Sequence, residues 1–324
     1  MPKPRSSDAK LERLRLIRDQ PSSPEIRLEL AGALNDASNH VIAAAAAIVA
    51  RLDLRDLIPN LTAAFERLMI DPIENDKTCA GKLAIVDALN ALECQDHDVF
   101  LAGVRHVQLE PVWGGRKDTA DSLRAGCAIG LVRIGYSGML PLLVDLLTDS
   151  ERIVRSAAAQ SLAALGSTAA LLLLRLKARL GDADPEITGE CLAGLMRVEP
   201  RESAAFVADF LHTDDTAVAE LALLAFGNSR WPGAYDVLKS FWDGRPRGEL
   251  KETTLVAIAL LRSPAAIDWL LSLVQNAAES TAMLALSALA ILNYDARVAE
   301  RAADVVQSRD LADLNEMFAK KFTR

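Results

Sequence analysis

The sequence predicts an all-α protein, an α-α superhelix of about eight helical-hairpin repeats. Ala and Leu supply about a third of the 324 residues, whereas the chain has only 8 Phe, 4 Trp and 3 Tyr. Small side chains let helices approach closely and Leu fills the space between them, while a β-sandwich would need more β-branched and aromatic residues. An apolar frame that recurs about every 32 residues adds the signature of a repeat array.

The repeat frame is clearest in three stretches that begin at Leu123, Val154 and Ile187. In each, small or apolar residues follow four, eight and eleven positions later, which places all of them on one face of a helix. The same frame continues further along the chain, where it begins at Val218, Leu250 and Ala282. Between these frame helices lies a second helical run and then an acidic turn, so each unit is a helical hairpin that must stack on its neighbours.

Two earlier units, which begin at Val41 and Gly81, fit the frame with longer spacing. Their extra residues lie around 70–77 and 109–119. We therefore expect a single solenoid over the whole chain, with about eight units and capping helices at both ends. In order, its expected parts are a disordered tail (1–9), N-terminal capping helices (10–39), repeats (40–305) and a C-terminal capping helix (309–322).

The best-matched unit resembles a known family. Its pattern is similar to a HEAT repeat of the short bacterial type, also called PBS-lyase HEAT-like, and the likeness is best over about 118–230. The residues that carry it are Asp149, Ile153, Val154, Arg155, Ala157, Ala158, Leu162, Leu165 and Gly166. The resemblance implies a HEAT/armadillo-like solenoid that serves as a binding scaffold. Some relatives attach bilins to phycobiliproteins and a related fold serves DNA glycosylases, but neither group has a motif that can be placed here residue by residue.

Bulk composition indicates the setting in which the chain works. The formal net charge of −8 gives no general attraction for nucleic acid or for anionic membranes. The longest apolar run, residues 41–50, is half the length of a membrane span, and the N-terminal residues lack the apolar core of a secretory signal. The four cysteines lie in apolar helical runs and are interpreted as buried hydrophobic residues. We expect a cytoplasmic protein without membrane contact.

Catalytic signatures are missing from the sequence. The four histidines are scattered, and no phosphate loop, dinucleotide loop or HExxH motif occurs. The triplet Asp96-His97-Asp98 could hold a metal weakly, but its position favours a helix start. We therefore expect no catalytic residues, no metal and no cofactor, and we favour a protein without enzymatic activity.

The insertion that contains Trp113, Gly114 and Gly115 is the first candidate binding element. A loop that presents an aromatic residue from a rigid scaffold is a common binding element, and insertions in repeat arrays often emerge on the binding face. Three interpretations stay open: Trp113 plugs a gap between repeats, it contacts a partner near the edge of the concave face, or the loop is disordered.

A second candidate lies between residues 231 and 251, where basic and aromatic residues alternate. Trp231, Arg245 and Arg247 would suit a single nucleic-acid strand or a flipped base. A solvated loop with partly packed tryptophans is the competing interpretation.

Arg124 and Arg155 occupy the same frame position in adjacent units. The resemblance to HEAT repeats implies that such an Arg pairs with a turn Asp such as Asp149. The alternative is a strip of cations that binds an anion.

The function that these observations favour is a non-enzymatic HEAT-repeat scaffold that binds a protein partner on its concave face. The alternative is a nucleic-acid-binding or DNA-glycosylase-like protein that acts through residues 231–251. A bilin-lyase-like protein is the third hypothesis.

Overall fold

The structure is a computed structural model that describes residues 6–246 and 248–322. Helix covers 76% of the described residues, which confirms the predicted fold class. The chain divides into two compact units, unit 1 up to Ser161 and unit 2 from Leu162 onward, and the division falls inside helix α10 (Arg152–Leu165). Each unit is described by itself.

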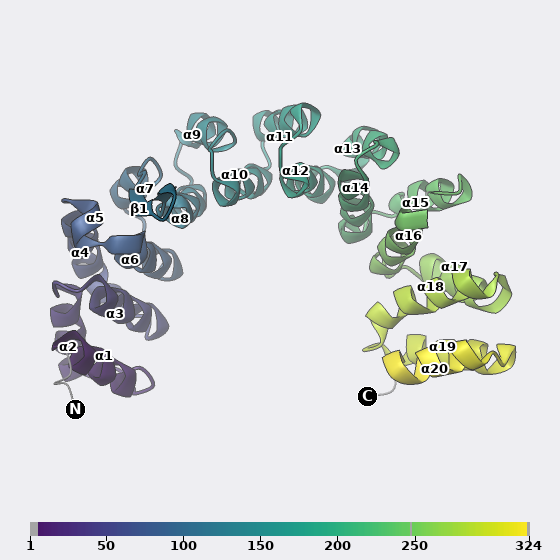
Figure 1. Cartoon of the computed structure of the whole chain (residues 1–324), viewed down its shortest axis with the longest axis horizontal. Coiled ribbons are helices and arrows are strands. Elements are labelled where there is room, and N and C mark those ends of the chain that lie inside the picture. The colour runs from purple at the N-terminus through teal and green to yellow at the C-terminus, as the bar shows by residue number, and fades with distance from the viewer. Residues whose placement is uncertain (1–5, 247, 323–324) are drawn as a thin grey trace. The chain divides into compact units, whose positions relative to one another are not determined.

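Unit 1 contains two layers of antiparallel helices (Figure 1). Helices α3, α6 and α8 pack side by side in one layer, and α2, α4 and α7 pack against them in the other. In chain order the elements are α1 (Ser6–Ile17), α2 (Pro24–Leu34), α3 (Asn39–Arg51), η1 (Arg55–Leu57), α4 (Ile58–Leu68), α5 (Pro72–Asn75), η2 (Lys77–Cys79), α6 (Ala80–Ala91), α7 (Asp98–Gly103), β1 (Leu109–Val112), β2 (Gly115–Asp118), α8 (Asp121–Arg133) and α9 (Met139–Leu146).

Unit 2 repeats the same two-layer arrangement. Helices α12, α14, α16 and α18 pack on one another in succession, and the helix that precedes each of them in the chain lies in the other layer. The elements are α11 (Thr168–Leu180), α12 (Pro185–Val198), α13 (Pro200–Asp209), η3 (Phe210–His212), α14 (Thr216–Ser229), α15 (Ala234–Asp243), α16 (Gly248–Leu260), α17 (Pro264–Asn276), α18 (Glu279–Leu289), η4 (Ala290–Leu292), α19 (Ala296–Arg309) and α20 (Ala312–Phe322).

The repeat frame explains which helix faces are buried. Every frame start is buried, and each begins the apolar face of a helix in the α3–α6–α8 layer, of α10, or of the α12–α18 layer. These residues are Val41, Gly81, Leu123, Val154, Ile187, Val218, Leu250 and Ala282. The predicted helix frame is therefore confirmed.

The acidic turns act as the sequence predicts. Asp184 caps α12 by accepting a hydrogen bond from the Glu186 backbone N–H at 3.1 Å, and Asp215 caps α14 by accepting one from Val218 N–H at 3.2 Å. These carboxylates satisfy N–H groups that have no partner inside the helix. Each acidic turn thus ends one hairpin and starts the next helix.

The four cysteines are free and buried, as expected. Burial raises the pKa of the Cys79 and Cys191 thiols to about 12, so both stay protonated at neutral pH. Among the described residues, no helix has both the length and the apolar character of a membrane span.

Two details of the sequence prediction are wrong. Helix α1 already begins at Ser6, inside the stretch expected to be a disordered tail, because the apolar stripe that follows packs on α3 and Asp8 favours the first helical turn. The rest of that stretch, residues 1–5, lies outside the described residues. The second departure from the all-α prediction is the insertion at 109–119, which forms a two-stranded antiparallel hairpin.

Candidate protein-binding hairpin

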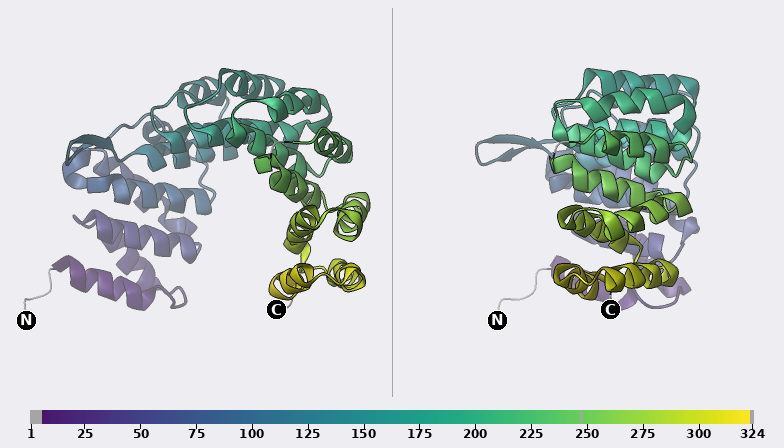
Figure 2. Two further views of the ribbon diagram at one scale, coloured as in Figure 1. Left: turned by 45° about the vertical axis from the view of Figure 1, so that its right-hand side comes forward. Right: turned by 90° about the vertical axis from the view of Figure 1, so that its right-hand side faces the viewer.

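The hairpin of β1 and β2 projects away from the helices of unit 1 (Figure 2, right). Its register pairs Leu109 with Asp118 and Val112 with Gly115, so Trp113 and Gly114 form a two-residue turn at the tip. Gly114 has a φ of +92°, a conformation that a side chain would oppose. Trp113 is 103% exposed. Its packing-plug interpretation is therefore wrong, because a fully exposed indole fills no gap between repeats.

The base of the hairpin is held by the buried carboxylate of Glu110. Its Oε1 atom accepts hydrogen bonds from the Thr78 backbone N–H at 2.6 Å, from Gln108 Nε2 at 2.7 Å and from Thr119 Oγ1 at 2.8 Å. Burial alone would raise the pKa of Glu110, but these hydrogen bonds lower it below the ordinary value. Glu110 therefore stays ionised and joins β1 to the residues before α6.

A buried ion pair lies beneath this carboxylate. Lys82 Nζ lies 3.3 Å from Asp76 Oδ2 and donates a hydrogen bond to Gln108 Oε1 at 2.9 Å, and both charged side chains have no solvent exposure. Asp76 also accepts from the backbone N–H groups of Gly81 and Lys82, which caps α6. The intervening Thr78 adopts a left-handed φ of 65°. The hydrogen bond of its N–H to the hairpin holds this unfavourable conformation.

Arg124 holds the other side of the hairpin base. Its guanidinium donates to both Asp149 carboxylate oxygens at 2.9 Å, to Asp118 Oδ2 at 2.7 Å and to the His106 carbonyl at 2.9 Å. This confirms the predicted pairing with the turn Asp. Arg124 is only 2% exposed, so its candidate role in binding is corrected to a structural one. Burial also lowers the pKa of the neighbouring His106.

Arg155 has a related position one unit further along the chain. Its Nη1 atom donates to the backbone carbonyls of Asp149 and Ser150, both at 2.9 Å. Arg155 therefore fixes the same turn that Arg124 holds through a carboxylate.

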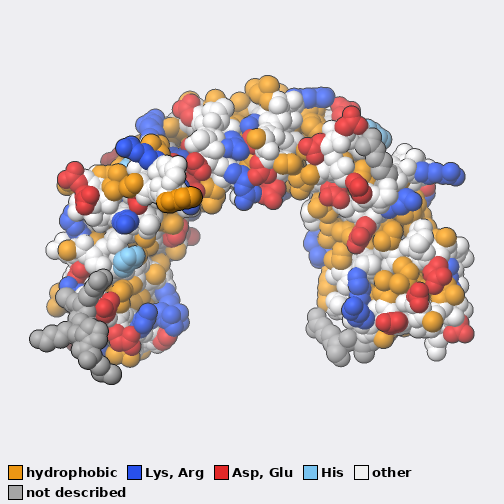
Figure 3. Space-filling view, viewed as in Figure 1, with side chains coloured by type: hydrophobic (Ala, Val, Ile, Leu, Met, Phe, Trp, Pro, Cys, Tyr) orange, Lys and Arg blue, Asp and Glu red, His pale blue; other side chains and the backbone are white. Residues whose placement is uncertain are grey.

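A groove of about 340 Å³ runs between the hairpin and the turn after α9. Arg116 is paired with Pro111, and paired residues of an antiparallel ladder lie on the same face. Leu109 is two residues before Pro111 on the same strand and shares that face, so Leu109 and Arg116 both belong to the hairpin face that borders the groove. Figure 3 shows hydrophobic and basic side chains next to one another over this part of unit 1. The groove is lined by Val107, Leu109, Arg116, Lys117, Asp118, Arg124, Asp149, Ser150 and Glu151.

The second candidate region, 231–251, lies in unit 2 with its aromatic residues mostly engaged. Trp242 packs edge-on against Trp269 with 5.9 Å between the ring centroids, and Lys239 lies over the Trp269 ring and forms an ion pair with Asp243. Trp231 is half-buried. Trp242 and Lys239 therefore pack within the unit instead of forming an open platform for bases.

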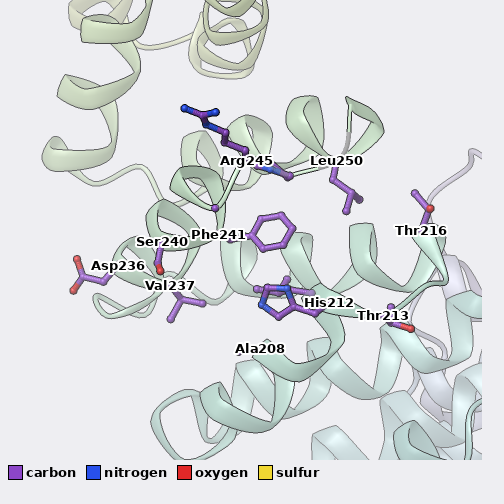
Figure 4. A pocket seen from close by; sticks show the side chains of 13 residues that line it. Ala208, His212, Thr213, Thr216, Asp236, Val237, Ser240, Phe241, Arg245 and Leu250 are labelled. Atoms are coloured by element: carbon purple, nitrogen blue, oxygen red, sulfur yellow. The ribbon is translucent and has the colours of Figure 1, made fainter.

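A pocket of about 620 Å³ lies between α13 and α15 (Figure 4). Phe241 and His212 face each other in its middle, with 5.5 Å between ring centroids, and the Arg245 guanidinium points away from them. Arg245 lines this pocket and Trp231 does not, so the structure does not bring these two candidates to one site. Arg247 lies outside the described residues.

The triplet Asp96-His97-Asp98 is exposed at the start of α7. Its ligand atoms lie within 4.8 Å of one another, and Asp96 accepts a hydrogen bond from the Asp98 backbone N–H at 3.0 Å. The His97 ring stacks on Tyr136 at 5.7 Å. Its contacts within the described residues are those of a helix start, and nothing further points to a cation.

Stacked helical hairpins with buried frame positions define an α-solenoid. The segment from β2 to α11 identifies the kind of repeat. The family model for HEAT repeats matches residues 115–176. Residues 115–176 therefore carry HEAT repeats. Among solved structures, the crystal structure of an engineered protein is 17% identical, with 99% of this chain and 95% of that protein covered and a TM-score of 0.38. No curated protein matches the chain.

Sequence reasoning singled out Trp113 and its glycines but missed the strands. The one buried residue of β1 is Glu110 and that of β2 is Asp118. Because the buried positions are acidic, the strands lack the buried apolar residues whose alternation would signal a strand. The one available signal was the Trp113-Gly114 turn between two short polar runs. The burial of Glu110 and Asp118, which holds the strands in place, is known only from the structure.

Proposed function

We propose that this HEAT-repeat protein is a scaffold that binds a protein partner through the hairpin, with Trp113 as the anchor. The observation that carries the proposal is the full exposure of Trp113 at the tip of a rigidly held element. A large aromatic residue in water contributes nothing to folding, whereas tryptophan is among the residues that contribute most when an interface buries them.

The rigidity of the hairpin base supports the same proposal. Glu110 and Asp118 anchor one strand each, and their hydrogen bonds reach both neighbouring repeats of unit 1. A binding element that is ordered before it meets its partner loses less conformational entropy on binding. This favours a docking element over a loop that orders only in the complex.

The finer expectation of contact along the concave face stays a prediction. The inner helices would offer a second, extended surface to the same partner, as solenoids of this class do. The hairpin is the surface from which the partner should be identified first.

The experiment compares Trp113→Ala with a matched exposed residue. Leu28 on α2 is 77% exposed and lies in the same unit, so Leu28→Ala removes a similar apolar surface elsewhere. A partner captured from native cells would be purified and titrated by calorimetry against both variants. We expect Trp113→Ala to weaken binding at least about 30-fold and Leu28→Ala to change it less than about twofold.

The free energy of unfolding is measured on the same variants. An exposed side chain should change it by less than about 0.5 kcal/mol. Equal binding by wild type and Trp113→Ala would refute the proposal. Parallel losses of stability and of binding in Trp113→Ala would also refute it, because they would assign the indole a packing role.

A further inference from the structure

All the exposed charges on the hairpin and its approach are positive. Arg105, Arg116 and Lys117 are exposed, whereas the acids of the same stretch, Glu110 and Asp118, are buried and hydrogen-bonded. Within the described residues, no carboxylate comes within ion-pair distance of these three cations. A chain with a net charge of −8 thus presents a local basic surface where it also exposes Trp113.

Apolar residues lie beside these cations. Val107 and Leu109 are 56% and 46% exposed, and both line the groove together with Arg116. Leu109 and Pro111 are two residues apart on one face of β1, and Pro111 is paired with Arg116. An apolar contact and a cation are therefore separated by about 7 Å, the distance between alternate residues of an extended chain.

We propose that the groove binds an extended, acidic segment of the partner protein, in which an aliphatic residue and an Asp or Glu are two positions apart. This inference rests on the proposed function and specifies the chemistry of its partner. The aliphatic side chain covers Val107 and Leu109, and the carboxylate pairs with Arg116. Trp113 then packs on whatever follows at the tip of the hairpin.

The opposite wall of the groove sets the direction of the segment. Glu151 lines it, and its Oε1 atom lies only 3.4 Å from the Ser150 hydroxyl, with no cation within ion-pair distance among the described residues. Asp149 shares the Arg124 guanidinium with Asp118. A partner carboxylate is repelled on the Glu151 side and attracted on the Arg116 side, so the segment lies with its acids toward the hairpin.

The test uses the full chain and a phage-displayed library of random dodecapeptides, selected at low salt. We expect enriched peptides to share an aliphatic residue and an Asp or Glu two positions apart. Arg116→Glu should weaken the best peptide at least tenfold, while the same charge reversal at Lys251, an exposed residue of unit 2, should change it less than twofold. The enriched peptide with its acid replaced by Lys should bind Arg116→Glu better than it binds wild type.

The outcomes separate this inference from the proposed function. If Trp113→Ala abolishes binding of the native partner but the charge swap fails to restore peptide binding, the acidic segment is refuted and the proposed function stands. If neither the partner nor the peptides depend on Trp113, both are refuted. Binding of the basic surface to anionic vesicles or to single-stranded DNA, with the same loss in Arg116→Glu and no acidic peptide enriched, would overturn the inference in favour of those ligands.

Discussion

Replacing Glu110 with Ala tests whether the hairpin is a rigid part of unit 1. The change removes one carboxylate oxygen that accepts three hydrogen bonds, from Thr78, Gln108 and Thr119. It leaves the strand register and the exposed surface of the hairpin unaltered, because Glu110 is buried beneath them. The loss should therefore appear in stability and in the dynamics of the hairpin.

The magnitude follows from what each donor can find instead. Thr119 Oγ1 also lies 3.3 Å from the Gln108 carbonyl, so its hydroxyl keeps a partner. Thr78 is exposed, and its N–H can be hydrated after the change, which costs about 1 kcal/mol. The second N–H of the buried Gln108 amide has no substitute and costs about 1–3 kcal/mol. Relief from burying a charge offsets part of this, so we expect about 2 kcal/mol.

Urea denaturation followed by circular dichroism measures this difference, and amide hydrogen exchange locates it. Protection of the β1–β2 hydrogen bonds should fall by about 30-fold, while helices of unit 2 keep theirs. Lys117→Ala is the matched control, because Lys117 is paired with Glu110 across the ladder but is exposed. A loss below about 0.5 kcal/mol for Glu110→Ala, equal to the control, would show that the network does not hold the hairpin.

Three further predictions concern packing and the charges at the hairpin base. Gly227→Ala should cost about 2 kcal/mol, because its Cβ would come within 2.6 Å of the α16 backbone, whereas Gly32→Ala, with open space around it, should gain about 0.5–1 kcal/mol in thermal melts. Burial lowers the pKa of His106, so the folded chain favours the neutral imidazole. The free energy of unfolding should therefore decrease as the pH falls below about 6.5, the ordinary pKa of histidine. His106→Gln should reduce this loss in urea titrations at pH 7.5 and 5.5, and an unchanged loss would contradict the assignment. Asp76→Ala should cost about 3–5 kcal/mol and Lys82→Met clearly less, since Asp76 keeps its N–H donors when the lysine is removed. Equal costs would place the stabilisation in the ion pair instead of the helix cap.

The helical part of the fold could be predicted because its signal is local. Each frame helix carries its apolar residues at fixed spacing, and the burial of Val154, Ile187 and Leu250 follows from helix periodicity alone. The caps at Asp184 and Asp215 are local as well. A repeat array presents the same signal in unit after unit, so no contact between distant residues had to be inferred.

The hairpin base could not be predicted, because its determinants are distant in sequence. Glu110 and Thr78 are 32 residues apart, and so are Gln108 and the Asp76 carbonyl that accepts from it. In the sequence alone, a Glu and a Lys in such segments indicate solvated surface, whereas Glu110 and Lys82 are buried. The exposure of Trp113 depends on the same contacts, since a hairpin without its anchor could fold back and bury the indole.

The two long insertions of unit 1 explain each other. The segment before α6 has a left-handed Thr78 whose N–H donates to the hairpin through Glu110. The hairpin in turn needs a partner for Gln108, and the Asp76 carbonyl and the Lys82 ammonium provide it. Either insertion alone would leave buried polar groups without partners, at about 1–3 kcal/mol for each group. The longer spacing of the two early repeats is therefore one structural device, which holds an exposed tryptophan away from an otherwise regular array.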